Sequence, residues 1–296
     1  MLSRLIAAGL PLVPRPVVYR VARRYVAGVA MGDALATARA LAADGLRTTT
    51  ALLGERLEDP GEVEATVVEY VGLLEALERA GLEGGISVKP THVGLSIDTE
   101  VCHASLERLV TEAARRGRFV RIDMEDHRTT DATLMIHDQL RRRHDNVGVV
   151  LQAYLKRTLD DVAALPEGSS VRLCKGIYAE PAYLVVGGYE AVRANFLLVL
   201  ERLLERGAWT AIATHDEWLV GEALCRVEAS GRDRRGWELQ MLHGVAPVLR
   251  QRLAAEGHRI RVYIPYGPDW YDYSLRRLRE NPRIAMHVLR AMAGRS

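Results

Sequence analysis

Cysteine is scarce in this chain of 296 residues, and long charged runs are missing. The three cysteines, Cys102, Cys174 and Cys225, are odd in number and have no CxxC spacing, which argues against a disulfide framework and against a zinc site. No run of basic residues exceeds three and the net charge is only +2, so a nucleic-acid partner is not expected. These absences favour a protein with free thiols in the reducing cytoplasm.

A long apolar segment is also missing. The stretch Leu5–Val13 is apolar, but Pro11 and Pro14 interrupt it and no A-x-A cleavage site follows it cleanly. A membrane-spanning helix needs about 20 consecutive apolar residues, so we expect neither a span nor a cleaved signal peptide. Residues 1–45 are interpreted as an N-terminal helical arm. Membrane contact and self-association into a homo-oligomer both remain open for this arm.

Short apolar strands alternate with longer helical segments along the rest of the chain. The strand candidates are Arg47–Leu53, Ile86–Lys89, Phe119–Met124, Val147–Tyr154, Val171–Lys175, Thr210–Thr214, Glu238–Leu242 and Arg261–Ile264. Several, such as the run VGVVLQ, are apolar at almost every position, which is typical of parallel strands buried on both faces. The main helical segments between them are Glu62–Ala80, Glu100–Arg116, Thr130–His144, Tyr189–Arg206 and His215–Ser230.

This alternation predicts an α/β protein with a (β/α)8 barrel, the TIM barrel, over residues 46–296. A doubly wound open sheet is the alternative, but no G-x-G-x-x-G motif follows the first strand. A glycine stands where each of several helices should end, at a C-cap position: Gly81, Gly117, Gly207, Gly231 and Gly257. No repeat, low-complexity tract or linker divides the sequence, so residues 1–296 are expected to form a single domain.

Polar residues recur at one end of the successive strands, where barrels of this kind keep their active sites. They are Lys89, Asp123, Glu125, Gln152, Arg172, Lys175, His215, His243 and Tyr263. The chain has only three lysines, and two of them belong to this set. A buried charge must be paired or bound to a ligand. The set therefore indicates either a ligand site or internal ion pairs, such as Lys89 with Asp123 and Arg172 with Glu125.

A second polar cluster lies near the end of the sequence. Arg276 and Arg277 are adjacent, so on a helix their side chains diverge by about 100° and can grip a small anion from two sides. Tyr273 lies one helical turn before them. A solvated helix face is the alternative for such a pair. The aromatic residues upstream and Lys89 inside the barrel favour the recognition of a carboxylate.

Seven segments resemble the proline dehydrogenase family, including the barrel domain of the bifunctional proline utilisation A proteins. They are ISVKPTHVGL, VRIDMEDH, VVLQAYLKRT, VRLCKGIYAEPAY, IATHD, ELQMLHG and RVYIPYGPDWYDYSLRRLRENP, in the family's order over about residues 46–282. Ala179 follows Tyr178 where the bifunctional proteins carry Trp, which favours the monofunctional branch. The resemblance implies a distorted barrel whose last helix lies over the active site.

The resemblance also implies an activity. A protein of this family uses FAD to oxidise L-proline to 1-pyrroline-5-carboxylate, the first step of proline catabolism to glutamate, and passes the electrons to a membrane quinone. It is expected in the cytoplasm, with peripheral contact to the inner face of the membrane.

For the substrate, the resemblance implies a carboxylate site made of Lys89, Arg276 and Arg277, with Asp123 as the acid that holds Lys89. The wall around the pyrrolidine ring is expected to consist of Tyr263, Tyr273 and Leu242. Glu55, at the end of the first strand, is interpreted as a gate that pairs with the two arginines when no substrate is bound. The residues with expected catalytic roles are Lys89, Asp123, Arg172 and Tyr263.

For the cofactor, the resemblance implies that Arg172 donates to the N5 region of the flavin, where a donor stabilises the negative charge of the reduced ring. Further flavin-binding positions are expected at Gln152, Lys175, Thr214, His215 and Glu280. No metal is expected.

Three other functions remain as alternatives from the residues alone. A Schiff-base aldolase would use Lys89 or Lys175 as its nucleophile. A metal-dependent hydrolase would use His215, Asp216 and His243, but neither H-x-H nor H-E-x-x-H occurs. A barrel that binds a small anion without turnover is the alternative that is not an enzyme.

Overall fold

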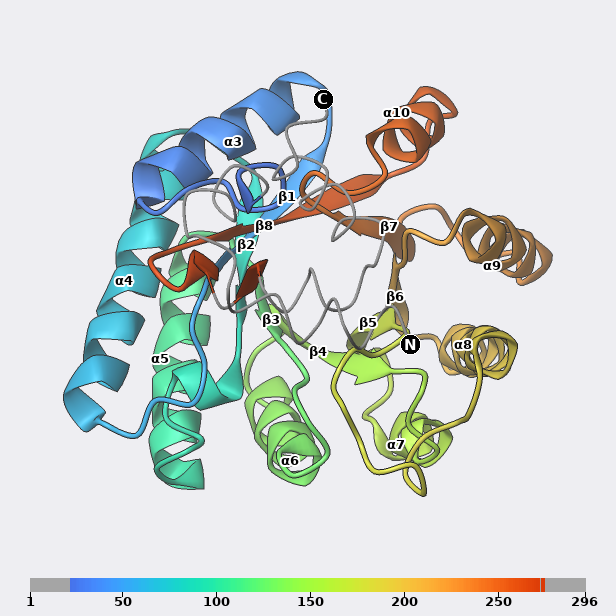
Figure 1. Cartoon of the computed structure of the whole chain (residues 1–296), viewed down its shortest axis with the longest axis horizontal. Coiled ribbons are helices and arrows are strands. Elements are labelled where there is room, and N and C mark those ends of the chain that lie inside the picture. Colours follow the sequence, from blue (N-terminus) through green and yellow to red (C-terminus); the bar gives the residue numbers. More distant parts are fainter. Residues whose placement is uncertain (1–21, 272, 275–296) are drawn as a thin grey trace, which may run out of the picture.

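The computed structural model of the protein describes residues 22–271, 273 and 274, and its centre is a closed barrel of parallel strands. The strands are β1 (Arg47–Leu52), β2 (Gly84–Val88), β3 (Val120–Ile122), β4 (Val147–Gln152), β5 (Ser170–Cys174), β6 (Trp209–Ala213), β7 (Trp237–Leu242) and β8 (Ile260–Tyr266). They pair in chain order, and β8 closes the barrel on β1 (Figure 1). The predicted (β/α)8 barrel is therefore confirmed, and each expected strand overlaps an observed one.

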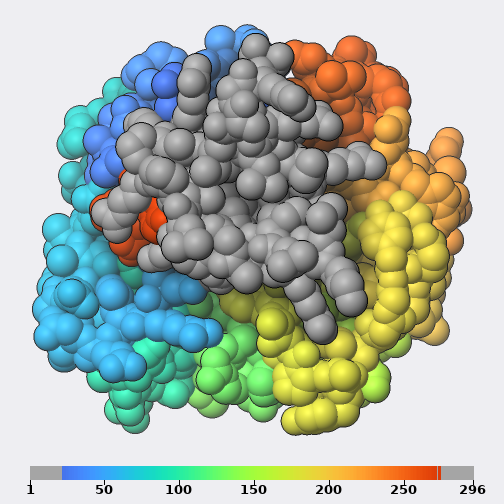
Figure 2. Space-filling view, in the orientation of Figure 1, coloured from blue at the N-terminus to red at the C-terminus, as the bar shows by residue number. Residues whose placement is uncertain are grey.

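The helices surround the barrel, as Figure 1 shows. They are α3 (Met31–Ala43), α4 (Pro60–Arg79), α5 (Thr99–Arg115), α6 (Thr130–Arg141), α7 (Thr158–Ala164), α8 (Tyr189–Glu205), α9 (Glu217–Ala229) and α10 (Pro247–Ala255), with a short 3₁₀ helix, η2, at Pro90–His92. In the space-filling view their segments form a ring whose colours follow the chain (Figure 2). None of the helices in the described ranges is long and apolar enough to cross a membrane.

Local signals in the sequence set the ends of these helices. Asp59, Asp98 and Asp216 each accept a backbone N–H of the first turn, at the starts of α4, α5 and α9. The five glycines expected at helix ends all have left-handed φ angles, between 61° and 79°. A residue with a Cβ atom rarely adopts this conformation, so the predicted C-caps are confirmed.

Burial on both faces explains the apolar strand sequences. All six residues of β4 are buried, because one face points into the barrel and the other packs against the surrounding helices. Tyr70 of α4 and Phe196 of α8 are among the largest side chains that are fully buried in this outer layer.

Helix α3 precedes β1 and packs against the closing strands β1 and β8 (Figure 1). Its buried face consists of Ala34, Ala38 and Leu41, and the small size of the two alanines lets the helix approach the barrel closely. Helix α3, which belongs to the predicted N-terminal arm, thus covers the place where β8 closes the barrel on β1.

Candidate active site

A cavity of about 870 Å³ lies at the carboxyl ends of the strands. The residues predicted for the site that line it are Lys89, Asp123, Gln152, Arg172, Lys175, Thr214, His215, Leu242, Tyr263 and Tyr273. Arg276, Arg277 and Glu280 lie outside the described residues. The strands thus bring together, in one cavity, polar residues that are far apart in the sequence.

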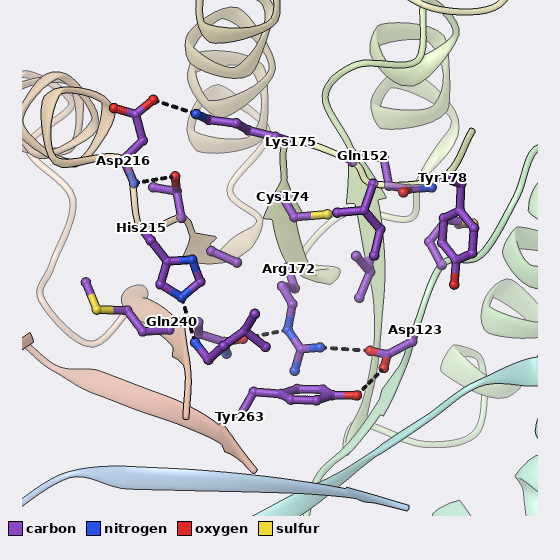
Figure 3. Close-up of a pocket in the computed structure, with 18 of the residues that line it drawn as sticks. Asp123, Gln152, Arg172, Cys174, Lys175, Tyr178, His215, Asp216, Gln240 and Tyr263 are labelled. Atoms are coloured by element: carbon purple, nitrogen blue, oxygen red, sulfur yellow. Dashed lines mark hydrogen bonds and ion pairs between the residues drawn. The ribbon is translucent and has the colours of Figure 1, made fainter. Parts of the chain in front are cut away.

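The carboxylate of Asp123 accepts hydrogen bonds from three donors, two of which, Arg172 and Tyr263, are shown in Figure 3. It accepts hydrogen bonds from Arg172 Nη1 at 2.8 Å, from Ser87 Oγ at 2.6 Å and from Tyr263 Oη at 3.1 Å. Burial, followed by the charge of Asp123, holds the pKa of Tyr263 well above its usual value, so its hydroxyl remains a neutral donor. Arg172 also donates from Nε to Gln240 and lies over the Tyr263 ring, 5.4 Å from its centre. The Arg172 guanidinium is thereby fixed from several sides.

The expected pairing of Asp123 with Lys89 is wrong. Lys89 Nζ lies 3.3 Å from the carboxylate of Glu55 and donates to the carbonyl of Gly54 at 3.4 Å, whereas Asp123 pairs with Arg172. Arg172 and Asp123 reach one inward layer because side chains of alternate strands, here β5 and the end of β3, share layers in such a barrel. Lys89 follows the end of β2 and lies closest to the loop after β1.

The alternative pairing of Arg172 with Glu125 is also wrong. The Glu125 carboxylate accepts two hydrogen bonds from Thr91, one from its backbone N–H and one from its hydroxyl. The described ion pair of Glu55 is with Lys89, and the gate that would join Glu55 to the two arginines stays a prediction.

A second charged cluster lies at the rim of the cavity around Asp216, the residue after His215. Its carboxylate accepts hydrogen bonds from Lys175 Nζ, from two nitrogens of Arg193 at 2.7 Å and from Tyr189 Oη at 2.7 Å. Burial alone would raise the pKa of Asp216, but these donors hold it below its ordinary value. Lys175, expected at the flavin, is thus held by a carboxylate that the sequence suggested only for the alternative hydrolase site.

The rim residues were identifiable only in part from the sequence. Asp216 stands directly after the expected strand-end His215 in the segment IATHD and begins α9, so its place at the mouth follows from local signals. Tyr189 and Arg193 belong to α8, far from IATHD in sequence, and no local pattern marks them. His215 itself accepts the backbone N–H of Leu242 at 2.8 Å and so links the ends of β6 and β7 (Figure 3).

The loop after β5, residues 175–188, is held over the cavity by Tyr154. The backbone N–H of Tyr154 donates to the Lys175 carbonyl at 2.8 Å, and its own carbonyl accepts the N–H of Val186 at 2.7 Å. Its hydroxyl donates to the carbonyl of Tyr178, which lines the cavity, at 3.3 Å. The ring packs directly on Gly176, whose φ is 105°.

Replacing Gly176 by alanine should therefore disturb this loop. A Cβ atom at Gly176 would lie 2.0 Å from a ring carbon of Tyr154, and the left-handed φ adds strain. We expect the free energy of unfolding to fall by at least about 1 kcal/mol. Gly187→Ala in the same loop is the matched control, since its Cβ would meet nothing within 4 Å. Equal denaturant midpoints for the two variants would show that the Tyr154 ring can move away from the added Cβ atom without a loss of stability.

The arrangement suits a large flat ligand next to a small anion. Cys174, Gly176 and Ala213 give the wall at β5 and β6 short side chains, so space remains beside it. Lys89, after β2, supplies a cation to the lining, which also includes the rings of Tyr263 and Tyr273. Within the described residues, no group of three or more His, Cys, Asp or Glu side chains is placed to hold a metal ion.

Comparisons with known proteins agree with this arrangement. The sequence profile described as "Proline dehydrogenase" matches residues 34–289. The proline dehydrogenase of Deinococcus radiodurans is 36% identical over 287 residues, which cover 94% of this chain and 92% of the relative. Proline dehydrogenase 1 of Bacillus subtilis is 33% identical over 272 residues, covering 92% of this chain and 90% of the relative.

The fold also matches a solved structure. The crystal structure of proline utilization A from Bdellovibrio bacteriovorus superposes with a TM-score of 0.81 at 23% identity. The match covers 88% of this chain and 32% of that longer chain. Because the two sequences are only 23% identical, this likeness is evidence for the barrel fold alone.

Proposed function

The chain belongs to the proline dehydrogenase family and oxidises proline to 1-pyrroline-5-carboxylate, and on that premise we propose that FAD is its cofactor and a membrane quinone its electron acceptor. The observation that carries the proposal is the family match over most of the chain, combined with a large cavity at the strand ends. The reaction would be the first step in the catabolism of L-proline to glutamate.

The residues of the cavity fit a flavin dinucleotide. A volume of about 870 Å³ lies at the upper end of the usual range for ligand pockets, as a large cofactor requires. Arg172 uses Nη1 and Nε for protein acceptors, but its Nη2 makes no hydrogen bond within the described part of the chain and can donate to a ligand. We propose flavin-binding roles for Arg172 and for Gln152, Lys175, Thr214, His215 and Glu280. FAD, when bound, accepts a hydride equivalent from the substrate.

We propose that the substrate lies on the Lys89 side of the cavity. Lys89, Arg276 and Arg277 would bind the carboxylate of proline, and Tyr263, Tyr273 and Leu242 would enclose its ring. Arginine suits this task because its planar fork meets a carboxylate with two hydrogen bonds. Holding a small rigid substrate at its carboxylate orients the ring, and such positioning contributes much of an enzyme's rate.

The proposal is tested by the spectrum of the purified protein. It should be yellow with a flavin absorbance that disappears on anaerobic addition of L-proline and returns on addition of a short-chain benzoquinone. A colourless protein that remains active on proline would overturn the cofactor. A flavin that proline bleaches but the quinone does not reoxidise would overturn the acceptor alone.

A quinone dissolved in a membrane requires the enzyme to meet the bilayer surface. We therefore propose a cytoplasmic protein with peripheral contact to the inner face of the membrane. Sedimentation with vesicles that contain anionic lipid tests this contact, and protein that stays in the supernatant with and without proline would exclude it. Sedimentation velocity of the same sample distinguishes a monomer from a homo-oligomer.

Tyr273 should determine how well the enzyme excludes hydroxylated proline. It is 7% exposed and lines the cavity. The resemblance implies that it faces the ring carbon that carries the hydroxyl in 4-hydroxyproline. Burying that hydroxyl beside an aromatic ring costs about 1–3 kcal/mol, so kcat/KM for proline should exceed that for trans-4-hydroxy-L-proline by at least about tenfold. Tyr273→Ser should lower the ratio of the two kcat/KM values, chiefly by lowering kcat/KM for proline. Steady-state assays of both substrates check it, and equal wild-type efficiencies would contradict it.

A further inference from the structure

Glu125 is a buried carboxylate that forms no ion pair with the described part of the chain. It is 3% exposed, and in the described ranges no Lys, Arg or His nitrogen lies within 4.0 Å of its oxygens. Both oxygens instead accept hydrogen bonds from Thr91, Oε2 from the backbone N–H at 2.9 Å and Oε1 from the hydroxyl at 2.6 Å. Burying a charge in this way is costly, and burial raises the pKa of Glu125. The two hydrogen bonds from Thr91 therefore offset part of the cost of burying this carboxylate.

Thr91 also forms hydrogen bonds with the loop after β1. Its hydroxyl accepts the backbone N–H of Arg56 at 3.0 Å, and its carbonyl accepts the N–H of Leu57 at 3.0 Å. Because the hydroxyl must donate to Glu125, its lone pairs are turned to Arg56. Arg56 has a left-handed φ of 58°, which is unusual for a residue with a side chain, and its guanidinium pairs with Asp126 at 3.1 Å. The hydrogen bonds to Thr91 and the ion pair with Asp126 thus hold the loop in a shape that is strained at Arg56.

Thr91 is close to both members of the Lys89–Glu55 ion pair, to Lys89 along the chain and to Glu55 through its hydrogen bond with Arg56. Lys89 lies two residues before Thr91, and Glu55 directly precedes Arg56. Lys89 Nζ lies 3.3 Å from Glu55 and donates to the Gly54 carbonyl at 3.4 Å. Thr91 therefore fixes the backbone on both sides of this pair.

Glu125 is also connected to the other side of the cavity. Its backbone carbonyl accepts a hydrogen bond from Gln152 Nε2 at 2.8 Å, and Gln152 lines the cavity at the end of β4. Glu125, three residues after the end of β3, thus connects the lysine side of the cavity to the side proposed for the flavin.

We propose that Glu125, acting through Thr91, is a positioning residue that sets the spacing between Lys89 and Glu55 at which the substrate carboxylate is received. The inference rests on the substrate role proposed for Lys89. The competing explanation is that Thr91 and Glu125 only stabilise the turn at η2. In that case their loss lowers stability without changing the affinity for proline.

The test compares two substitutions of Thr91. Thr91→Val keeps the shape of the side chain but removes its hydroxyl, whereas Thr91→Ser keeps the hydroxyl. Thr133→Val is the matched control, because Thr133 is fully buried, bonds only locally to the Thr129 carbonyl and does not line the cavity. In Thr91→Val we expect KM for proline to rise about tenfold with kcat changed by less than about twofold. Thr91→Ser should stay within about twofold of wild type in KM, and Thr133→Val should lower only the melting temperature. An unchanged KM in Thr91→Val, with a fall in melting temperature like that of Thr133→Val, overturns the proposal.

Two further variants keep the test decisive if Thr91→Val does not fold. Arg56→Gly removes the tether to Asp126 and also relieves the left-handed φ, at a side chain that is 56% exposed, and it should raise KM about threefold. Glu125→Gln, which replaces one acceptor oxygen by a donor, should raise KM as Thr91→Val does. Wild-type KM in every folded variant overturns the proposal.

A double mutant separates positioning from a general loss of order. If Thr91 acts through the Lys89–Glu55 pair, Thr91→Val should raise KM much less in a Glu55→Gln background than in the wild type. Multiplicative effects on KM would contradict the coupling. Bleaching of the wild-type flavin by proline separates the proposed function from this inference. If proline fails to bleach the flavin, the proposed function is rejected. If proline bleaches it but KM is unaltered in the variants, this inference alone is rejected.

Discussion

Replacing Asp123 by alanine should lower the free energy of unfolding by about 3–5 kcal/mol, the loss expected when one partner of a buried ion pair is removed. The side chains of Arg172 and Asp123 are only 8% and 13% exposed, and they meet at 2.8 Å. The substitution would also deprive Ser87 and Tyr263 of their acceptor. Proline oxidation should fall with it, because Arg172 and Tyr263 both line the cavity and would lose their fixed positions. Denaturant unfolding and steady-state kinetics measure the two effects.

Two controls make this result specific. Asp123→Asn keeps the shape and one acceptor oxygen, so its loss of stability should be smaller than that of Asp123→Ala. Asp145→Ala removes an exposed carboxylate that pairs with Arg141, and exposed pairs of this kind contribute little. Wild-type stability in Asp123→Ala would mean that Arg172 finds another acceptor in the barrel.

Lys89→Met should lower kcat/KM for proline by roughly 30- to 150-fold, which corresponds to about 2–3 kcal/mol for a lost hydrogen bond between charged groups. Methionine keeps the apolar stem of the lysine but carries no cation for the substrate carboxylate. Stability should fall by less than in Asp123→Ala, because the partner left behind, Glu55, is 26% exposed, whereas Arg172 is only 8% exposed. Flavin absorbance per protein should be unchanged.

Lys156→Met is the matched control for this substitution. Its amino group donates to the carbonyl of Tyr183 in an exposed position, and it does not line the cavity. Its kcat/KM should equal that of the wild type. A folded but colourless Lys89→Met protein would place Lys89 in the flavin site instead.

Two of the ion pairs at the cavity, Arg172–Asp123 and Lys89–Glu55, differ in a way that matches the roles proposed for them. Arg172 is enclosed by Asp123, Ser87, Gln240 and the ring of Tyr263, so it has little freedom to move. Lys89 pairs with Glu55, whose side chain is 26% exposed against 13% for Asp123, so an incoming carboxylate can replace this partner at a lower cost than it could replace Asp123. The rigid pair therefore suits the flavin side of the cavity and the exchangeable pair suits the substrate.

Much of the fold and part of the site could be predicted because the signals are local. The run VGVVLQ is apolar because β4 is buried on both faces, and the glycine after each of several helices is needed for a left-handed φ. Strand ends are equally local, and in a parallel barrel all carboxyl ends meet on one side. That is why polar residues spread along the chain could be assigned to a single cavity before any contact was known.

The sequence by itself thus determined the order of strands and helices, the closed barrel as the architecture that fits it, and the set of side chains at the carboxyl ends. Only the tertiary structure decided which charges meet. Arg172 lies 49 residues from Asp123 and 85 from Ser87 in the chain, and their contact depends on the stagger of strands around the barrel. Lys89 pairs with Glu55 because Thr91 and Glu125 bring the loop after β1 to the turn after β2. No periodicity records such contacts, since each results from the geometry of two or more elements at once.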